Sequence, residues 1–199
     1  MPRITEERRL ARRNQILSAA WRCFDRRGID ATSMDDIIAE AGLSAGAIYG
    51  YFSGKEALIV AALDVSLQRF EAFLVPLLVT PAPPPGAFVE QVLEAIRRFS
   101  VRGDFNLMRV ALHGWGVALR NEAIGLALAA RYRGIRARIA TYAACWVGED
   151  ADRCAAMGEL LMSVMLGYLA QTALLGDTVP QHYRLALEAL ADPAAVRPR

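Results

Sequence analysis

The sequence predicts an all-α fold of about nine helices, and three observations support this prediction. Hydrophobic residues make up 54% of the 199 residues, which is enough to bury a sizeable core. Alanine is abundant, and runs of β-branched residues are short. No stretch alternates apolar and polar residues with the period of two that a half-buried strand requires.

The first helix is expected over residues 4–27. Gly28 follows it as a terminator, because glycine readily adopts the backbone conformation that ends a helix. The apolar residues of its second half recur at helical spacing: Ile16, Leu17, Ala20, Trp21 and Phe24.

A second, short helix is expected over residues 33–41, in the stretch "TSMDDIIAEAG". Ser33 and Asp36, three residues apart, resemble a capping box with Asp in place of the usual Glu. Gly42 ends this helix, because it can take the left-handed conformation that a sharp turn requires.

Ser44 then caps a third helix, expected over residues 45–52. Ser53 and Glu56 form a second capping box, which starts a long fourth helix over about 54–79.

The proline-rich stretch "TPAPPPG", residues 80–86, is the clearest break in the chain and predicts a rigid turn in which no helix continues. Gly103, Gly114 and Gly116 are expected to join later helices, as are "VGED" and "GDTVP". The tail "DPAAVRPR" is expected to fray. The helices after the break are expected at about 87–101, 104–113, 121–147, 150–175 and 180–191.

The charge is uneven along the chain, although the net charge is only +2. Residues 1–27 carry eight arginines against three acidic residues, a local net charge of +5, so that the other 172 residues sum to −3. A basic end on a near-neutral body suggests an anionic partner at that end. The alternative is a solvated, arginine-rich first helix.

The composition argues against an enzyme, a metal site or a cofactor. The three cysteines, Cys23, Cys145 and Cys154, contain no C-x-x-C, which fits a reducing cytoplasm without disulfides or zinc. The chain has two histidines and no G-x-S-x-G, and "SGKE" fails as a phosphate-binding loop because Glu56 follows the lysine. No signal peptide is expected at the N-terminus.

The apolar stretch 155–175 is about long enough to span a membrane. It contains Glu159 and Gln171 and lacks basic flanks and an aromatic belt, so a helix buried on several sides is the better interpretation. A membrane-associated structural protein stays as an alternative that rests on this stretch alone.

The helices 33–41 and 45–52, joined by the three residues 42–44, form a helix-turn-helix pattern. Its inward positions are accounted for by Ile37, Ile38, Ala41, Leu43, Ile48 and Phe52. A face of small, neutral and aromatic residues is left over, where an exposed helix usually carries Glu, Lys or Gln. Such a face suits a surface pressed against DNA, since tyrosine hydroxyls bond phosphates and alanine methyls touch thymine methyls.

Residues 12–58 resemble the DNA-binding domain of the TetR family of transcriptional repressors. The landmarks that carry the resemblance are Ile16-Leu17 with Ala19-Ala20, Phe24, Gly28, Ile37, Ala41-Gly42, Ser44, Ile48-Tyr49, Tyr51-Phe52 and Lys55-Glu56 with Leu58.

The resemblance implies a cytoplasmic, ligand-responsive repressor that binds palindromic double-stranded operator DNA as a homodimer and is released by a small-molecule effector. It implies a DNA-binding domain over 1–55 and a ligand-binding and dimerisation domain over 56–199. The positions implied to touch DNA are Ser33, Ser44, Ala45, Gly46, Ala47, Tyr49, Gly50, Tyr51 and Lys55.

Lys55 has separate support, because it is the only lysine beside 22 arginines and lies near a helix N-terminus, where a phosphate would bind. The small residues Ala45, Ala47 and Gly50 offer no bidentate hydrogen bonds to bases, so shape and methyl contacts are expected to matter. An N-terminal arginine arm in the minor groove is a further option.

Polar residues within apolar helices are candidates for contact with an effector. Arg109 and His113 lie four apart in one such helix, and Tyr168, Gln171 and Thr172 lie in another. The alternative is that these groups are hydrogen-bonded parts of the core, as a lone core histidine usually is.

A seam with 4-3-4-3-4 spacing and small residues at its middle suggests dimerisation through the helix at 150–175. Its members are Ala156, Leu160, Ser163, Gly167, Ala170 and Leu174. The resemblance places the second helix of this interface at 180–191, with Tyr183, Leu187 and Leu190.

Two variants of the regulator hypothesis stay open. The protein would be an activator instead of a repressor, or a thiol switch on Cys145 or Cys154 would replace the ligand. Buried, inert thiols are the simpler interpretation of these cysteines.

Overall fold

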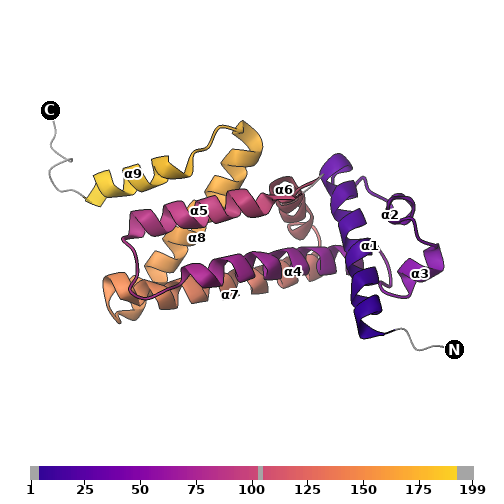
Figure 1. The fold of residues 1–199 in the computed structure, drawn as a ribbon, viewed down its shortest axis with the longest axis horizontal. Helices are drawn as coiled ribbons and strands as arrows, with labels where there is room; N and C mark the ends of the chain where they lie inside the picture. The colour runs from indigo at the N-terminus through magenta and orange to yellow at the C-terminus, as the bar shows by residue number, and fades with distance from the viewer. Residues whose placement is uncertain (1–4, 103–104, 192–199) are drawn as a thin grey trace. The chain divides into compact units, whose positions relative to one another are not determined.

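The computed structural model describes residues 5–102 and 105–191, and over these residues the protein is almost entirely helical (Figure 1). The all-α prediction is confirmed. The elements are α1 (Glu6–Arg27), α2 (Met34–Ala41), α3 (Ala45–Tyr49), α4 (Lys55–Leu74), the 3-10 turn η1 (Val75–Leu77), α5 (Pro85–Ser100), β1 (Val101–Arg102), β2 (Phe105–Asn106), α6 (Leu107–Ala118), α7 (Glu122–Val147), α8 (Ala151–Leu175) and α9 (Pro180–Ala191).

Several boundary predictions were wrong, among them the end of the fourth helix, which was expected at about 79 and lies at Leu74. Helix α5 begins at Pro85, inside the predicted proline break, because the first turn of a helix needs no N–H donor from proline. Gly114 lies inside α6 and not at a joint, and it is buried beside Leu63, whose side chain would have to shift to admit a methyl group there. Gly116 also lies inside α6, and Gly103 falls outside the described residues.

A two-residue antiparallel ladder precedes α6 and was not expected from the sequence. Val101 pairs with Asn106, and Arg102 pairs with Phe105. The pairing is too short to produce an alternating pattern of apolar residues, which is the signal that identifies strands in a sequence.

The chain divides into two compact units, Met1–Gln68 with Val101–Arg131, and Arg69–Ser100 with Tyr132–Arg199. We call these unit 1 and unit 2. Helices α4 and α7 each contribute residues to both units.

Unit 1 is built around the second half of α1, which packs against α2, β2 and α6. Trp21 stacks on Phe105 with ring centroids 5.7 Å apart, and its indole N–H donates to the carbonyl of Ala62 in α4 over 3.2 Å. Ile16 and Leu17 are completely buried. This core positions α2 and α3 at one side of α1, as Figure 1 shows.

Unit 2 packs α5 against α8 and α9; in Figure 1 α9 runs along α5, and α8 crosses behind it. Phe88, Tyr142 and Trp146 form an aromatic cluster with centroids 5.1 Å apart in each pair. Tyr142 donates to the carbonyl of Val79 over 2.9 Å, and Trp146 donates to that of Pro83 over 2.8 Å. These two bonds hold the proline-rich segment against the cluster.

Helix α8 is long and apolar enough to cross a membrane by length and composition alone, with a mean hydropathy of 1.3 over its most apolar window. Helices of soluble proteins pass the same test, so this property is weak support for a membrane span. In this structure α8 buries Leu161, Met162, Met165 and Tyr168 within the protein.

Helices α7 and α8 approach closely at Gly158, and a substitution there tests the packing of unit 2. A methyl group on Gly158 would lie 2.9 Å from the Cβ of Ala140 and 3.1 Å from the carbonyl oxygen of Arg136. We expect Gly158→Ala to lower the free energy of unfolding by about 1–3 kcal/mol through overpacking.

Gly134→Ala is the matched control, because Gly134 lies inside α7 with no atom within 4 Å of an added methyl group. We expect this change to raise the free energy of unfolding by up to about 1 kcal/mol. Urea unfolding measures both variants, and a Gly158→Ala protein as stable as the wild type would contradict the close approach.

Candidate nucleic-acid interface

The helix-turn-helix is held by caps that the sequence predicted. The Ser33 N–H donates to the Asp36 carboxylate over 2.8 Å, and the Asp36 N–H donates to the Ser33 hydroxyl over 3.1 Å, which completes the capping box. Gly42 adopts the left-handed conformation, with φ of +63°. The Ser44 hydroxyl accepts from the N–H of Ala47 over 3.3 Å. The hydrogen bonds from Ser33 lower the pKa of the Asp36 carboxyl, and the nearby Arg27 guanidinium lowers it further.

The apolar residues of α2 and α3 divide as the pattern predicted, with two differences of degree. Ile37, Ile48 and Phe52 are buried, whereas Ile38 and Leu43 are only half-buried. Helix α3 has five residues, three fewer than expected, because the chain turns after Tyr49. Burial of Ile48 and Phe52 therefore anchors a very short helix.

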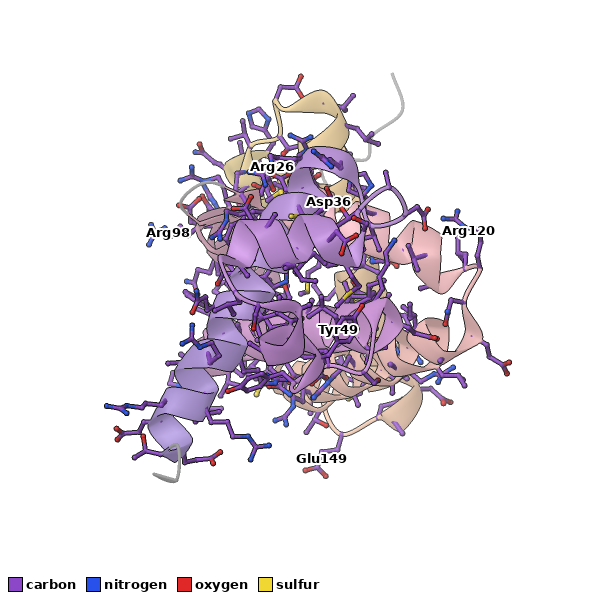
Figure 2. The ribbon with its side chains drawn as sticks, turned by 90° about the vertical axis from the view of Figure 1, so that its right-hand side faces the viewer. Arg26, Asp36, Tyr49, Arg98, Arg120 and Glu149 are labelled. Atoms are coloured by element: carbon purple, nitrogen blue, oxygen red, sulfur yellow. The ribbon has the colours of Figure 1, made fainter. Side chains whose placement is uncertain are left out.

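The opposite face of α3 is open. Ala45, Gly46, Tyr49 and Gly50 are exposed, and Ala47 and Tyr51 are half-buried. Tyr49 is 50% exposed and lies on the side of unit 1 that faces the viewer in Figure 2. Ser33 and Ser44 are also exposed, but their hydroxyls already serve as caps. The contact of these residues with DNA stays a prediction.

Lys55 begins α4 and is half-buried. Its ammonium group donates to the carbonyl of Asp30 over 2.8 Å, which fixes the side chain against the loop before α2. An ammonium group carries three donors, so this bond leaves donors for a phosphate.

The three arginines at the C-terminal end of α1 are paired with carboxylates of α2, an arrangement that the sequence did not reveal. Glu40 accepts from Arg22 over 2.6 Å and also bonds Arg26, while Asp36 accepts from Arg27 over 2.5 Å. Arg26, followed by Arg22, lowers the pKa of the Glu40 carboxyl. No local sequence pattern predicts these pairs, because their partners lie on another helix.

Helix α6 is attached to the end of α1 through Asp25, whose side chain is buried. Its Oδ2 accepts from the N–H of Asn106 over 3.2 Å, and its Oδ1 lies 3.3 Å from Nε of Arg109. Arg109 also donates to the carbonyl of Asp25 over 3.2 Å. Sequence reasoning missed Asp25, since nothing in its neighbourhood marks it as buried.

The structure places both effector candidates of α6 on an exposed face. The Arg109 side chain bonds Asp25 and is still 54% exposed. His113 is also exposed, and its imidazole ring lies against Gly28. An added methyl group on Gly28 would lie 3.3 Å from that ring. Both residues therefore contact the end of α1, and their binding of a ligand stays a prediction.

The three effector candidates of α8 lie in different environments. Tyr168 is completely buried, and among the described residues nothing bonds its hydroxyl. Its ring meets that of Tyr183 edge-on, with centroids 5.7 Å apart. Thr172 is half-buried and bonds the hydroxyl of Thr178, whereas Gln171 is exposed.

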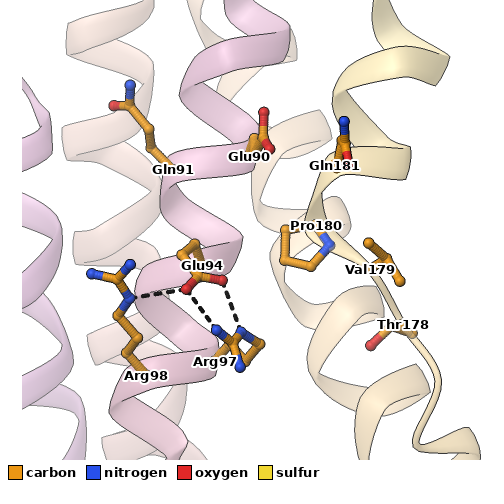
Figure 3. Close-up of a pocket in the computed structure, with 9 residues that line it drawn as sticks. All are labelled: Glu90, Gln91, Glu94, Arg97, Arg98, Thr178, Val179, Pro180 and Gln181. Atoms are coloured by element: carbon orange, nitrogen blue, oxygen red, sulfur yellow. Dashed lines mark hydrogen bonds and ion pairs between the residues drawn. The ribbon is translucent and has the colours of Figure 1, made fainter.

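Unit 2 also contains an open groove of about 590 Å³ between α5 and residues 178–181 (Figure 3). Glu94 at its wall accepts from Arg97 over 2.7 Å and from Arg98 over 2.9 Å. These bonds, chiefly that from Arg97, lower the pKa of Glu94 to about 2. The lining includes none of the predicted effector residues.

The predicted dimer seam is largely uncovered. Leu160 and Leu174 are 50% and 75% exposed, Ala156 and Ser163 are exposed as well, and Gly167 and Ala170 are half-buried.

The two half-buried residues that were predicted for α9, Tyr183 and Leu187, do not form its most exposed face. Leu190 is 76% exposed and Leu185, which was not predicted, is 48% exposed. The role of both helices in a dimer stays a prediction.

Fold and motif together define a helix-turn-helix domain within an all-α chain. Residues 16–62 match the family model described as "Bacterial regulatory proteins, tetR family". Over these residues the chain resembles the DNA-binding part of bacterial regulators of the TetR type.

Two curated relatives are similar over the same region. The "HTH-type transcriptional repressor Rv1474c" of Mycobacterium tuberculosis is 38% identical over 72 residues, which are 36% of this chain and 38% of the relative. The "HTH-type transcriptional regulator TtgR" of Pseudomonas putida is 44% identical over 64 residues, 32% of this chain and 30% of the relative. The match therefore spans only about a third of each relative.

A solved structure is similar over nearly the whole chain. The transcriptional regulator from Pseudomonas aeruginosa PAO1 superimposes with a TM-score of 0.76 at 23% identity, covering 96% of this chain and 91% of the other. At this identity the likeness establishes the fold of the C-terminal helices and nothing of their ligand.

The Glu40 network predicts a pH dependence of stability. Because the pKa of Glu40 is lowered from its ordinary 4.5, the ionised form stabilises the fold above that pH, and the contribution is lost as the pH falls through the folded-state pKa. We expect Glu40→Gln to cost about 1 kcal/mol at pH 7 and progressively less below pH 4.5.

Urea unfolding at pH 7, 5 and 3.5 measures this difference. Glu7→Gln, which makes the same change at an exposed site on α1, is the control. A difference between wild type and Glu40→Gln that is independent of pH would contradict the assignment.

Proposed function

We propose that this protein is a ligand-responsive transcriptional repressor that binds a palindromic operator as a homodimer and is released by a small-molecule effector. The observation that carries the proposal is the open face of α3, which is neutral, small and aromatic, on a helix fixed by caps at both neighbouring turns. An exposed helix face usually carries charged or polar residues, and this face has none that is charged. It therefore suits contact with the major groove of DNA.

The DNA contacts follow from this face. The methyl groups of Ala45 and Ala47 touch thymine methyls, and glycines allow the backbone to approach the groove. Tyr49 and Tyr51 donate their hydroxyls to phosphates, and Lys55 supplies a positive charge beside them. Base-specific hydrogen bonds are few, so the operator is recognised partly through its shape and deformability.

The homodimer is supported by the uncovered apolar residues of the C-terminal helices, among them Leu160, Leu174 and Leu190. A helix with apolar residues on two sides buries one side within its own chain and the other against a second copy. Residues 1–55 act as the DNA-binding domain, and residues 56–199 act as the ligand-binding and dimerisation domain.

The effector binds more tightly to the conformation of the dimer in which the spacing of the two DNA-binding domains does not match the operator. Contacts within unit 1 support a coupling between α6 and the head. Asp25 bonds Asn106 and pairs with Arg109, and Asp30 near the head pairs with Arg120 at the end of α6. A shift of α6 is therefore transmitted to α1. The protein acts in the cytoplasm, where the operator is found.

Selection of bound duplexes from random DNA tests the proposal, followed by a screen for small molecules that release the selected duplex. A palindromic consensus and a releasing ligand are the expected results. Failure to enrich any sequence would refute sequence-specific repression.

Tyr49→Phe tests the recognition face, because it removes one exposed hydroxyl without changing the ring. We expect operator affinity to fall about three- to tenfold, the equivalent of losing one hydrogen bond of about 1 kcal/mol. The thermal midpoint should not change, since the hydroxyl makes no described bond within the protein. Unchanged affinity in a gel shift at fixed salt would remove Tyr49 from the contact set.

The dimer is tested by Leu160→Glu combined with Leu174→Glu. We expect this variant to be monomeric in sedimentation, because two charges would have to be buried in the interface. Leu119→Glu makes the same kind of change at an apolar residue of unit 1 that is 88% exposed, and it should leave the dimer intact. A dimeric double variant would exclude this seam.

A further inference from the structure

The first half of α1 contributes no buried residue to the core of unit 1. Every residue from Glu6 to Gln15 is exposed except Arg13, which is half-buried, and the first buried residue is Ile16. In Figures 1 and 2 these turns extend beyond α2 and α3. At 1.5 Å per residue, Arg8 lies about 12 Å along the helix from Ile16.

The arginines of α1 fall into two groups by their partners. Arg22, Arg26 and Arg27 in the second half are paired with carboxylates of α2. Among the described residues no carboxylate pairs with Arg8 or Arg12 in the first half. The uncompensated positive charge of this helix therefore lies where the helix leaves the core.

Arg8 and Arg12 also line one open groove of about 570 Å³, together with Ala11, Gln15 and Tyr51. Three of these residues, Arg8, Arg12 and Gln15, are spaced four and three apart and share one side of α1. Tyr51 comes from the turn that follows α3, so the groove connects the basic stripe with the recognition helix.

Gln15 fixes the geometry of the groove. Its Nε2 donates to the carbonyl of Ala41, the last residue of α2, over 2.9 Å, and its Oε1 accepts from Arg12 over 3.1 Å. The Arg12 guanidinium is thereby held relative to the helix-turn-helix by a neutral group, which leaves its charge available.

We propose that the groove of Arg8, Arg12 and Tyr51 binds the phosphodiester backbone of the DNA whose major groove receives α3. The inference rests on the proposed function and adds a second contact surface to it. Guanidinium groups bind phosphate oxygens in bidentate geometry, and a tyrosine hydroxyl donates to the same oxygens. Phosphates repeat regularly along a DNA strand, whereas base edges differ from one step to the next. Two uncompensated arginines on one side of a helix therefore suit successive phosphates better than base edges.

Arg8→Gln combined with Arg12→Gln tests this site, because glutamine preserves helix propensity and these positions bury nothing. Affinity for the selected operator and for a non-operator duplex of equal length is measured from 0.05 to 0.3 M salt. Each lost phosphate contact lowers the slope of log K against log salt by about 0.9, so the slope should fall by about 1.8 per bound protomer. Affinity for both duplexes should fall by a similar factor, about tenfold or more at 0.1 M salt.

Two further variants provide controls. Arg8→Lys with Arg12→Lys retains both charges and should keep the wild-type slope. Arg9→Gln removes an adjacent charge that is paired with Glu6 and lies outside the groove, and its slope should match the wild type.

A double glutamine variant with the wild-type slope would overturn the proposal. A loss confined to the operator, with an unchanged slope, would also overturn it, since that result means readout of bases. A wild-type protein that binds no duplex at all would refute the proposed function itself, which separates the two failures.

Discussion

The burial of the second half of α1 is the constraint on which the DNA-binding part of the molecule depends. Full burial of an aliphatic or aromatic side chain contributes about 1.5–3 kcal/mol, and Ile16, Leu17, Trp21 and Phe24 are each at most 1% exposed. The same stretch fixes its neighbours. Trp21 bonds α4, Arg22 and Arg26 bond Glu40 of α2, and Asp25 bonds the start of α6. One helix thus fixes the positions of α2, α4 and the start of α6.

This support explains how α3 can be so small. A helix of five residues with a glycine inside it is unstable on its own, because nucleation is costly and glycine adds about 1 kcal/mol. Ile48 and Phe52 anchor it to the core, and Ser44 satisfies one of its free N–H groups. Since stability comes from one side only, the other side is free of any packing role and its residues are available for contact with DNA.

The sequence revealed what is local and missed what is tertiary. The caps at Ser33 and Ser44 and the left-handed Gly42 depend on residues within a few positions, and all three were predicted. The +5 charge of the first 27 residues was visible, but its division between paired and uncompensated arginines depends on Glu40 and Asp36 of another helix. The four-residue spacing placed Arg109 and His113 on one side of α6, yet spacing cannot decide that this side is exposed.

Two surfaces of the single chain are unfavourable as they stand, and their chemistry indicates their partners. Like charges four apart on a helix, such as Arg8 and Arg12, cost about 0.2–0.5 kcal/mol, and no burial in the fold offsets this. The exposed leucines of α8, Leu160 and Leu174, leave apolar area in water at about 25 cal/mol per Å². An anion relieves the first cost and an apolar surface relieves the second. Because they differ in kind and lie in separate units, the two surfaces fit the two different partners that we propose, a polyanionic duplex and a second copy of the chain.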